Sequence, residues 1–151
     1  MKLVRGAYME KERIRANEMN YPSPIQQSKE ATDIDFDKAV ALCLKNLKNV
    51  AFFFASHNEN SAMKCINLMQ SMGIERNHPH IYFSQLYGMS DHITYNMANA
   101  GYNSCKYLPY GPVEEVMPYL IRRAQENTAI AGQMSRELRL IKAERARRRS
   151  L

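Results

Sequence analysis

Arg122 and Arg123 are adjacent side chains that could bind a carboxylate. They follow an expected strand near residue 106, a Gly111-Pro112 turn and the first turns of an expected helix. Each guanidinium presents a planar fork of N–H donors that fits two carboxylate oxygens, which the point charge of lysine does not. In the alternative interpretation, the pair lies in the last turn of the helix, where cations complement the helix dipole and stay solvated.

The elements that must position such groups alternate along the chain. Apolar runs predict four buried β-strands, at residues 2–8, 50–56, 81–86 and 105–108. Helical periodicity appears between them, at residues 36–47, 63–69 and 93–98. Gly73 and Gly101 stand where helix ends favour a left-handed residue. This alternation predicts an α/β fold with a parallel sheet under helices, either doubly wound or a barrel.

Polar and small residues follow the predicted strands, where parallel α/β folds bind their ligands. They are Arg5-Gly-Ala-Tyr8, Ser56-His57, Gln85-Leu-Tyr-Gly-Met89 and Tyr107. Gly6 and Ala7 would let a flat or phosphorylated ligand approach the backbone, and Arg5 could balance its charge. Simple strand–helix packing is the alternative for Gly6 and Ala7. His57 could contact a ligand or be a core histidine bonded to backbone.

Composition narrows the class of protein. The chain is 45% hydrophobic and 24% charged, which is typical of one globular domain. It has no apolar run of membrane-spanning length and no secretory signal features, so we expect a cytoplasmic or organelle-matrix protein. Its three cysteines lack the spacing of a zinc site or redox dithiol, and we expect no metal.

Two segments stand apart from this alternation. Most of the net charge of +6 lies after residue 133, in an Arg-rich tail without interleaved aromatic residues. This pattern predicts a solvated basic helix, with contact to an anionic membrane surface as the second interpretation, and it argues against nucleic-acid binding.

Residues 10–35 read as a long polar connection between expected elements, and its length indicates a functional loop.

Six motifs together resemble the proline dehydrogenase family. They are Lys2-Leu-Val-Arg-Gly-Ala-Tyr8, Ala55-Ser-His-Asn58, Gln85-Leu-Tyr-Gly-Met-Ser-Asp91, Ala100-Gly-Tyr102, Lys106-Tyr-Leu-Pro-Tyr-Gly-Pro112 and Pro118-Tyr-Leu-Ile-Arg-Arg-Ala-Gln-Glu-Asn127. They occur in the family's order and span nearly the whole chain. Each motif alone would be a weak signal, whereas the set is specific.

The resemblance implies a (β/α)8 TIM barrel that binds FAD and oxidises L-proline to Δ1-pyrroline-5-carboxylate, with the electrons passed on to quinone. Residues 1–127 would form the second half of the barrel, strands five to eight, and residues 128–151 a basic helix packed on it. The N-terminal half of the barrel, or a second copy of this chain, would complete the site. The expected location is cytoplasmic, peripheral to the inner membrane, and mitochondrial in a eukaryote.

The resemblance also assigns roles to residues near the flavin. Arg5, Gly6 and Ala7 match a flavin-contacting segment, and Ser56 and His57 match a second flavin contact. Lys2 stands where many bacterial members of the family have an arginine at the flavin's reactive edge. This departure keeps the positive charge but loses the forked N–H donors of a guanidinium.

Other matching residues would surround the substrate. Tyr8, Tyr107 and Leu86 match the walls of the proline pocket, and Arg122 and Arg123 match the pair that binds the substrate carboxylate. Hydroxyproline dehydrogenases have a smaller residue in place of Tyr107, so its presence favours proline. Lys2 and Tyr107 are the expected catalytic residues. In the alternative interpretation of the whole chain, it is a truncated, non-catalytic fragment that offers only an interaction surface.

Overall fold

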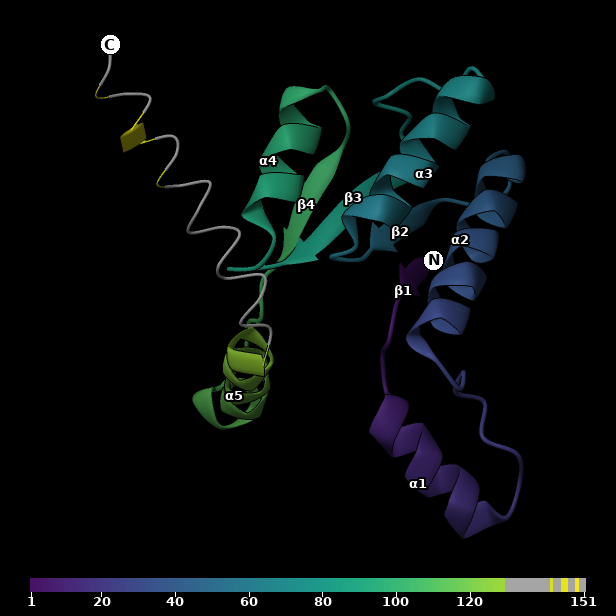
Figure 1. Ribbon diagram of the computed structural model, residues 1–151, viewed down its shortest axis with the longest axis vertical. Helices are drawn as coiled ribbons and strands as arrows, with labels where there is room; N and C mark the ends of the chain where they lie inside the picture. Colours follow the sequence, from purple (N-terminus) through teal and green to yellow (C-terminus); the bar gives the residue numbers. More distant parts are fainter. Residues whose placement is uncertain (130–141, 143–144, 147–148, 150–151) are drawn as a thin grey trace. The chain divides into compact units, whose positions relative to one another are not determined.

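The computed structural model describes residues 1–129, 142, 145–146 and 149 (Figure 1). They fall into two compact units, Met1–Tyr107 and Leu108–Leu151, which are described separately below. The expected basic helix at 128–151 lies almost wholly outside the described residues. The predicted domain boundary after residue 127 stays a prediction.

A four-stranded parallel sheet forms the centre of the first unit. Its strands are β1 (Lys2–Val4), β2 (Phe52–Ala55), β3 (Ile81–Leu86) and β4 (Ser104–Tyr107), and they lie side by side in that order. Each strand pairs in parallel with the next one along the chain, an order found in a barrel. All four predicted strands and the parallel sheet are confirmed.

The first strand is shorter than predicted. We expected it to reach residue 8, whereas β1 ends at Val4. Gly6 has a φ of 76° and Tyr8 a φ of 59°, which are left-handed conformations that no β-strand contains. Arg5 to Tyr8 therefore form a turn directly after the carboxyl end of the strand.

Three helices cover one face of this sheet (Figure 1): α2 (Lys29–Lys45), α3 (Glu59–Ser71) and α4 (Asp91–Asn99). Their buried side chains meet those of the strands, as where Phe36 packs edge to face on Phe54 with ring centroids 5.1 Å apart. Asn58 caps α3 by accepting a hydrogen bond from the backbone N–H of Ser61. The left-handed conformation predicted after the helices is confirmed at Gly73, with a φ of 65°.

The polar segment at residues 10–35 is not one long connection, so that prediction was wrong. Helix α1 (Met9–Met19) occupies its first part, and α2 begins at Lys29. The residues of α1 have high helix propensity, but only Ala16 among them is buried. Hydrophobic periodicity could not reveal this helix, because the helix has no apolar stripe.

The second face of the sheet presents exposed apolar side chains. Val4, Phe53, Tyr82 and Tyr107 all point away from the helices and remain exposed in the described residues. The rings of Phe53 and Tyr82, on neighbouring strands, lie 5.4 Å apart. A parallel sheet is normally covered on both faces, so a surface of this kind is unusual for the class.

The second unit contains α5 (Val113–Ala129), which begins directly after Pro112. Arg122 and Arg123 lie within this helix, and its last turn contains no basic residue. The interpretation of the pair as a complement to the dipole in a last helical turn is therefore wrong. Adjacent positions on an α-helix point in directions about 100° apart, so the two guanidiniums leave the helix at different angles.

The difference between the two sheet faces predicts a difference in stability. Phe54 is 0% exposed and Phe53 is 40% exposed, although they are neighbours in β2. We expect Phe54→Ala to lower the free energy of unfolding by about 3–5 kcal/mol, because it leaves a cavity in the core. The control variant Phe53→Ala should lower it much less. Chemical denaturation measures both, and equal losses would contradict a sheet that is covered on one face only.

Candidate active site

The turn after β1 exposes backbone at the carboxyl edge of the sheet. Gly6 has open space around the position where a Cβ would stand, with no atom within 4 Å. The side chain of Tyr8 is 73% exposed. A flat ligand could therefore approach the backbone of Gly6 and Ala7, which fits the flavin contact expected there.

Arg5 is held by a carboxylate from another element. Its guanidinium donates a hydrogen bond to Asp33 of α2, and the two groups form an ion pair. Lys29 Nζ lies 3.0 Å from Asp33 Oδ2. Asn58 Nδ2 donates to the same oxygen, at 3.4 Å. One carboxylate thus connects the ends of β1 and β2 with the first turns of α2.

The charge of this cluster stabilises the ionised form of Asp33. Partial burial would raise the pKa of the Asp33 carboxyl, but the hydrogen bond from Lys29 and the charge of Arg5 outweigh it. The pKa is therefore held below its usual value. The ion pair is present at neutral pH and would be lost only as the pH falls through this lowered pKa.

Buried hydrogen bonds fix the end of β2. Ser56 is buried, and its backbone carbonyl accepts a hydrogen bond of 3.3 Å from the side-chain amide of Gln85. Thr94 Oγ1 donates to Gln85 Oε1 at 2.7 Å, so the buried amide has partners on both sides. Because an unpaired buried amide is costly, this arrangement specifies one position for Ser56.

His57 lies beside the first residues of α4. Its Nδ1 is 3.0 Å from the hydroxyl of Ser90, which is buried and has a φ of 52°. The side chain is half-buried, at the same edge of the sheet as Arg5. This contact connects the end of β2 with the start of α4.

The ends of β3 and β4 are joined to each other. Leu86 pairs with Tyr107 in the sheet register. Lys106 reaches the loop between β3 and α4, where its Nζ lies 2.6 Å from the carbonyl of Met89 and 2.7 Å from Asp91 Oδ1. Lys106 therefore anchors the loop that also carries Ser90.

Lys2 and Tyr107 meet across the sheet. Lys2 Nζ lies 5.2 Å from the centroid of the Tyr107 ring, within range of a cation–π contact. The two residues belong to the outermost strands, which three strand spacings, roughly 14 Å in a flat sheet, would separate. Long side chains alone span this distance poorly, so the contact indicates a curved sheet with both residues on its concave face.

Arg122 and Arg123 belong to the second unit. Arg122 is exposed, and Arg123 is half-buried with its guanidinium carbon 5.3 Å from the centroid of the Tyr119 ring. The contact spans one helical turn and holds the Arg123 side chain against α5. Their role as a carboxylate site stays a prediction.

Several residues of this region carried no signal in the sequence. Asp33 stands inside the polar segment that we read as a connection, and Thr94 is one polar residue in an amphipathic helix. Lys106 belongs to a quoted motif, but nothing in the motif indicated its contacts with Met89 and Asp91. These contacts depend on which segments meet in the fold, so local patterns could not predict them.

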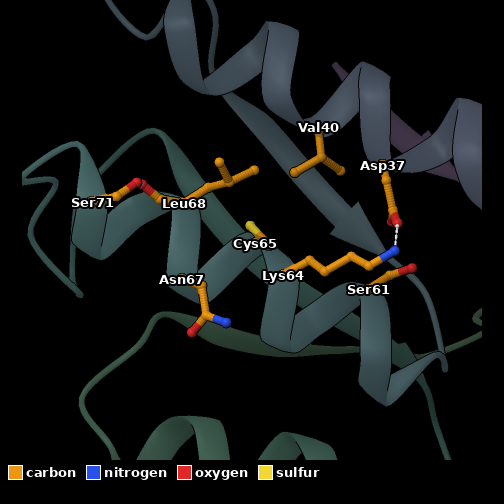
Figure 2. A pocket seen from close by; sticks show the side chains of 8 residues that line it. All are labelled: Asp37, Val40, Ser61, Lys64, Cys65, Asn67, Leu68 and Ser71. Atoms are coloured by element: carbon orange, nitrogen blue, oxygen red, sulfur yellow. Dashed lines mark hydrogen bonds and ion pairs between the residues drawn. The ribbon is translucent and has the colours of Figure 1, made fainter.

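A cavity of about 500 Å³ lies elsewhere, between α2 and α3 (Figure 2). Its lining includes Asp37 and Lys64, which form an ion pair of 2.6 Å, and the buried Cys65. Burial raises the pKa of the Cys65 thiol to about 12, so this thiol stays protonated. None of the expected site residues lines this cavity.

Metal clusters and membrane-spanning helices are both absent from the part of the chain that the structure describes. In that part, no three His, Cys, Asp or Glu side chains are grouped in a way that could hold a metal ion. Among the same residues, no helix has both the length and the apolar character needed to cross a bilayer.

Comparisons with known proteins agree on one family. The family model described as proline dehydrogenase matches residues 1–136. The chain is 43% identical to proline dehydrogenase 1, mitochondrial, of Drosophila melanogaster, over 97% of this chain and 23% of that protein. It is 41% identical to hydroxyproline dehydrogenase of Xenopus laevis, over 98% of this chain and 33% of that protein. The chain thus spans between about a quarter and a third of the length of these relatives.

A solved structure gives the same result. The chain resembles the crystal structure of proline utilization A (PutA) from Bdellovibrio bacteriovorus inactivated by N-propargylglycine, with a TM-score of 0.76 and 32% identity. The match covers 86% of this chain and 13% of that one. The chain belongs to the proline dehydrogenase family.

Proposed function

We propose that this chain forms a major portion of the active site of an FAD-dependent enzyme that oxidises L-proline to Δ1-pyrroline-5-carboxylate. The contact between Lys2 and Tyr107 carries the proposal. Both residues match family positions at the reaction centre, and they come from the two outermost strands of the sheet, yet the Lys2 ammonium lies 5.2 Å from the centre of the Tyr107 ring. Family membership alone would not require that these two groups meet.

The proposed architecture is the second half of a (β/α)8 barrel. Four parallel strands in chain order, with helices on one face, are the arrangement found in half of such a barrel. The exposed side chains of Val4, Phe53, Tyr82 and Tyr107 would then line the barrel interior. Four further strands, from the rest of a longer protein or from a second copy of this chain, would cover them.

The residues at the strand ends fit a bound flavin. Gly6 and Ala7 offer open backbone, Arg5 supplies positive charge, and Ser56 and His57 stand at the end of the neighbouring strand. When bound, FAD would accept the hydride from the ring carbon beside the proline nitrogen. The protein would position the ring and keep water away, which supplies much of the rate gain of such a reaction.

In the proposed site, different residues bind the carboxylate and the ring of proline. Arg122 and Arg123 would bind the carboxylate through charge-assisted hydrogen bonds. Tyr107, Leu86 and Tyr8 would pack on the ring. The chain is similar to proline and hydroxyproline dehydrogenases at nearly equal identity, so the preference for proline rests on the bulk of Tyr107.

The electrons would pass on to a quinone, with the protein peripheral to the membrane that contains it. The relatives from Drosophila melanogaster and Homo sapiens are named as mitochondrial, and in a eukaryote we propose the same location. The interpretation of the chain as a non-catalytic fragment is not favoured, because the family match includes every expected site residue.

A visible spectrum tests the function directly. We expect the protein, after incubation with FAD and desalting, to retain flavin absorption bands. Anaerobic L-proline should bleach them, because the reduced flavin no longer has those bands. The D-enantiomer is the control, since its carboxylate would lie on the wrong side of the ring. Retained flavin that L-proline leaves oxidised would contradict the proposed reaction.

The carboxylate role predicts a large effect of one substitution. Arg122→Ala should lower kcat/KM for L-proline by an amount equivalent to about 2–4 kcal/mol of transition-state binding, since it removes one of the two charged partners of the substrate carboxylate. Flavin content should not change. Arg13→Ala, in the exposed helix α1, is the control. Steady-state kinetics measure the effect, and an unchanged affinity for proline would rule out the role.

The bulk of Tyr107 predicts a change of specificity. Tyr107→Ser should raise kcat/KM for trans-4-hydroxy-L-proline relative to L-proline by about tenfold, because the smaller side chain leaves room for the hydroxyl group. The ratio of the two kcat/KM values is the measurement. Tyr95→Ser, at an exposed position of α4, should leave the ratio unchanged. If the ratio is the same in all three proteins, Tyr107 does not select the substrate.

A further inference from the structure

Asp33 connects the two segments that the proposed function assigns to the flavin. Its Oδ1 accepts the hydrogen bond from Arg5, next to Gly6 and Ala7. Its Oδ2 accepts a hydrogen bond from Asn58, directly after Ser56 and His57. The backbone N–H of Asn58 in turn donates to Ser56 Oγ at 3.1 Å. The two strand ends are therefore tied through a single carboxylate.

The helix that carries Asp33 provides a rigid base for this contact. Phe36 and Val40 follow Asp33 by three and seven residues, which places them on the same side of α2. Both are buried in the core, where Phe36 packs on Phe54 of β2. The carboxylate therefore has a position set by core packing and does not depend on the turn that it holds.

The charges of the cluster suit an anionic ligand. Arg5 and Lys29 are two cations around the one carboxylate of Asp33, so this cluster of three side chains carries one positive charge in excess. Without Asp33, the side chain of Arg5 would be free to turn towards solvent, and a ligand would have to order it on binding. Groups fixed in place before binding reduce this entropic cost.

We propose that Asp33 is a positioning residue that fixes Arg5 and the Ser56-His57 segment for flavin binding. This inference rests on the proposed function. Asp33 would act through Arg5 and Asn58 and would not itself contact the reacting atoms. Asp33 lies outside the six motifs on which the family resemblance rests, and the resemblance assigns it no role.

The experiment compares two aspartates of the same helix. Each folded protein is stripped of flavin and titrated with FAD, and binding is followed by fluorescence quenching. Asp33→Ala should weaken FAD binding about tenfold relative to wild type, because the variant loses a charged hydrogen bond. Asp37→Ala is the matched control. It also loses an ion pair on α2, with Lys64, but that pair lies in the cavity between α2 and α3 (Figure 2). We expect wild-type affinity for the control.

A second measurement separates positioning from a general loss of stability. Because Asp33 acts in part through Arg5, the double variant Arg5→Ala/Asp33→Ala should lose less affinity for FAD than the sum of the two single losses. Asp33→Asn, which keeps an oxygen acceptor, should recover part of the affinity. Thermal melts without FAD accompany each variant, and the loss of affinity should exceed any difference in folded fraction.

The outcomes distinguish this inference from the proposed function. A wild-type protein that binds no FAD would overturn both. Wild-type protein that binds FAD and an Asp33→Ala variant with the same affinity would overturn the inference alone. The inference alone would also fail if Asp33→Ala and Asp37→Ala lose affinity equally, or if the effects of Arg5→Ala and Asp33→Ala add in the double variant.

Discussion

The burial of one sheet face under three helices is the constraint on which the remaining structure depends. Phe52, Phe54 and Phe83 occupy alternate positions on that face and are almost completely inaccessible to solvent. A shift of one residue in any strand would turn these rings to the opposite face and bring their neighbours into the core. The strand register is thereby fixed, and with it the side on which every residue at a strand end must stand.

The same constraint leaves the opposite face to the proposed chemistry. Lys2 and Tyr107 belong to this face, beside the exposed rings of Phe53 and Tyr82. Charged and phenolic side chains are tolerated there because they need not be desolvated to fold the first unit. On the helix-covered face the buried amide of Gln85 has partners on both sides, because it bonds to both Ser56 and Thr94.

The sequence predicted the features that depend on local patterns. Four apolar runs indicated four strands, and Gly73 and Gly101 indicated helix ends. Helix α1 escaped because it has no apolar stripe, and the end of β1 was misjudged because Arg5 to Tyr8 read as extended. The cluster around Asp33 was beyond sequence reasoning, since Arg5 lies 28 and Asn58 lies 25 residues away from it and they meet only through the packing of α2. The arginine pair was predicted as a pair, but its place inside α5 was not.

Lys106 restricts the motion of the loop between β3 and α4, at the carboxyl edge of the sheet. Its ammonium group bonds to the Met89 carbonyl and to the Asp91 carboxylate. These two contacts attach the loop after β3 to strand β4. Displacing that loop would break a charged hydrogen bond with a half-buried ammonium group. The segment beside His57, which includes Ser90, is thus tied to strand β4 before any ligand binds.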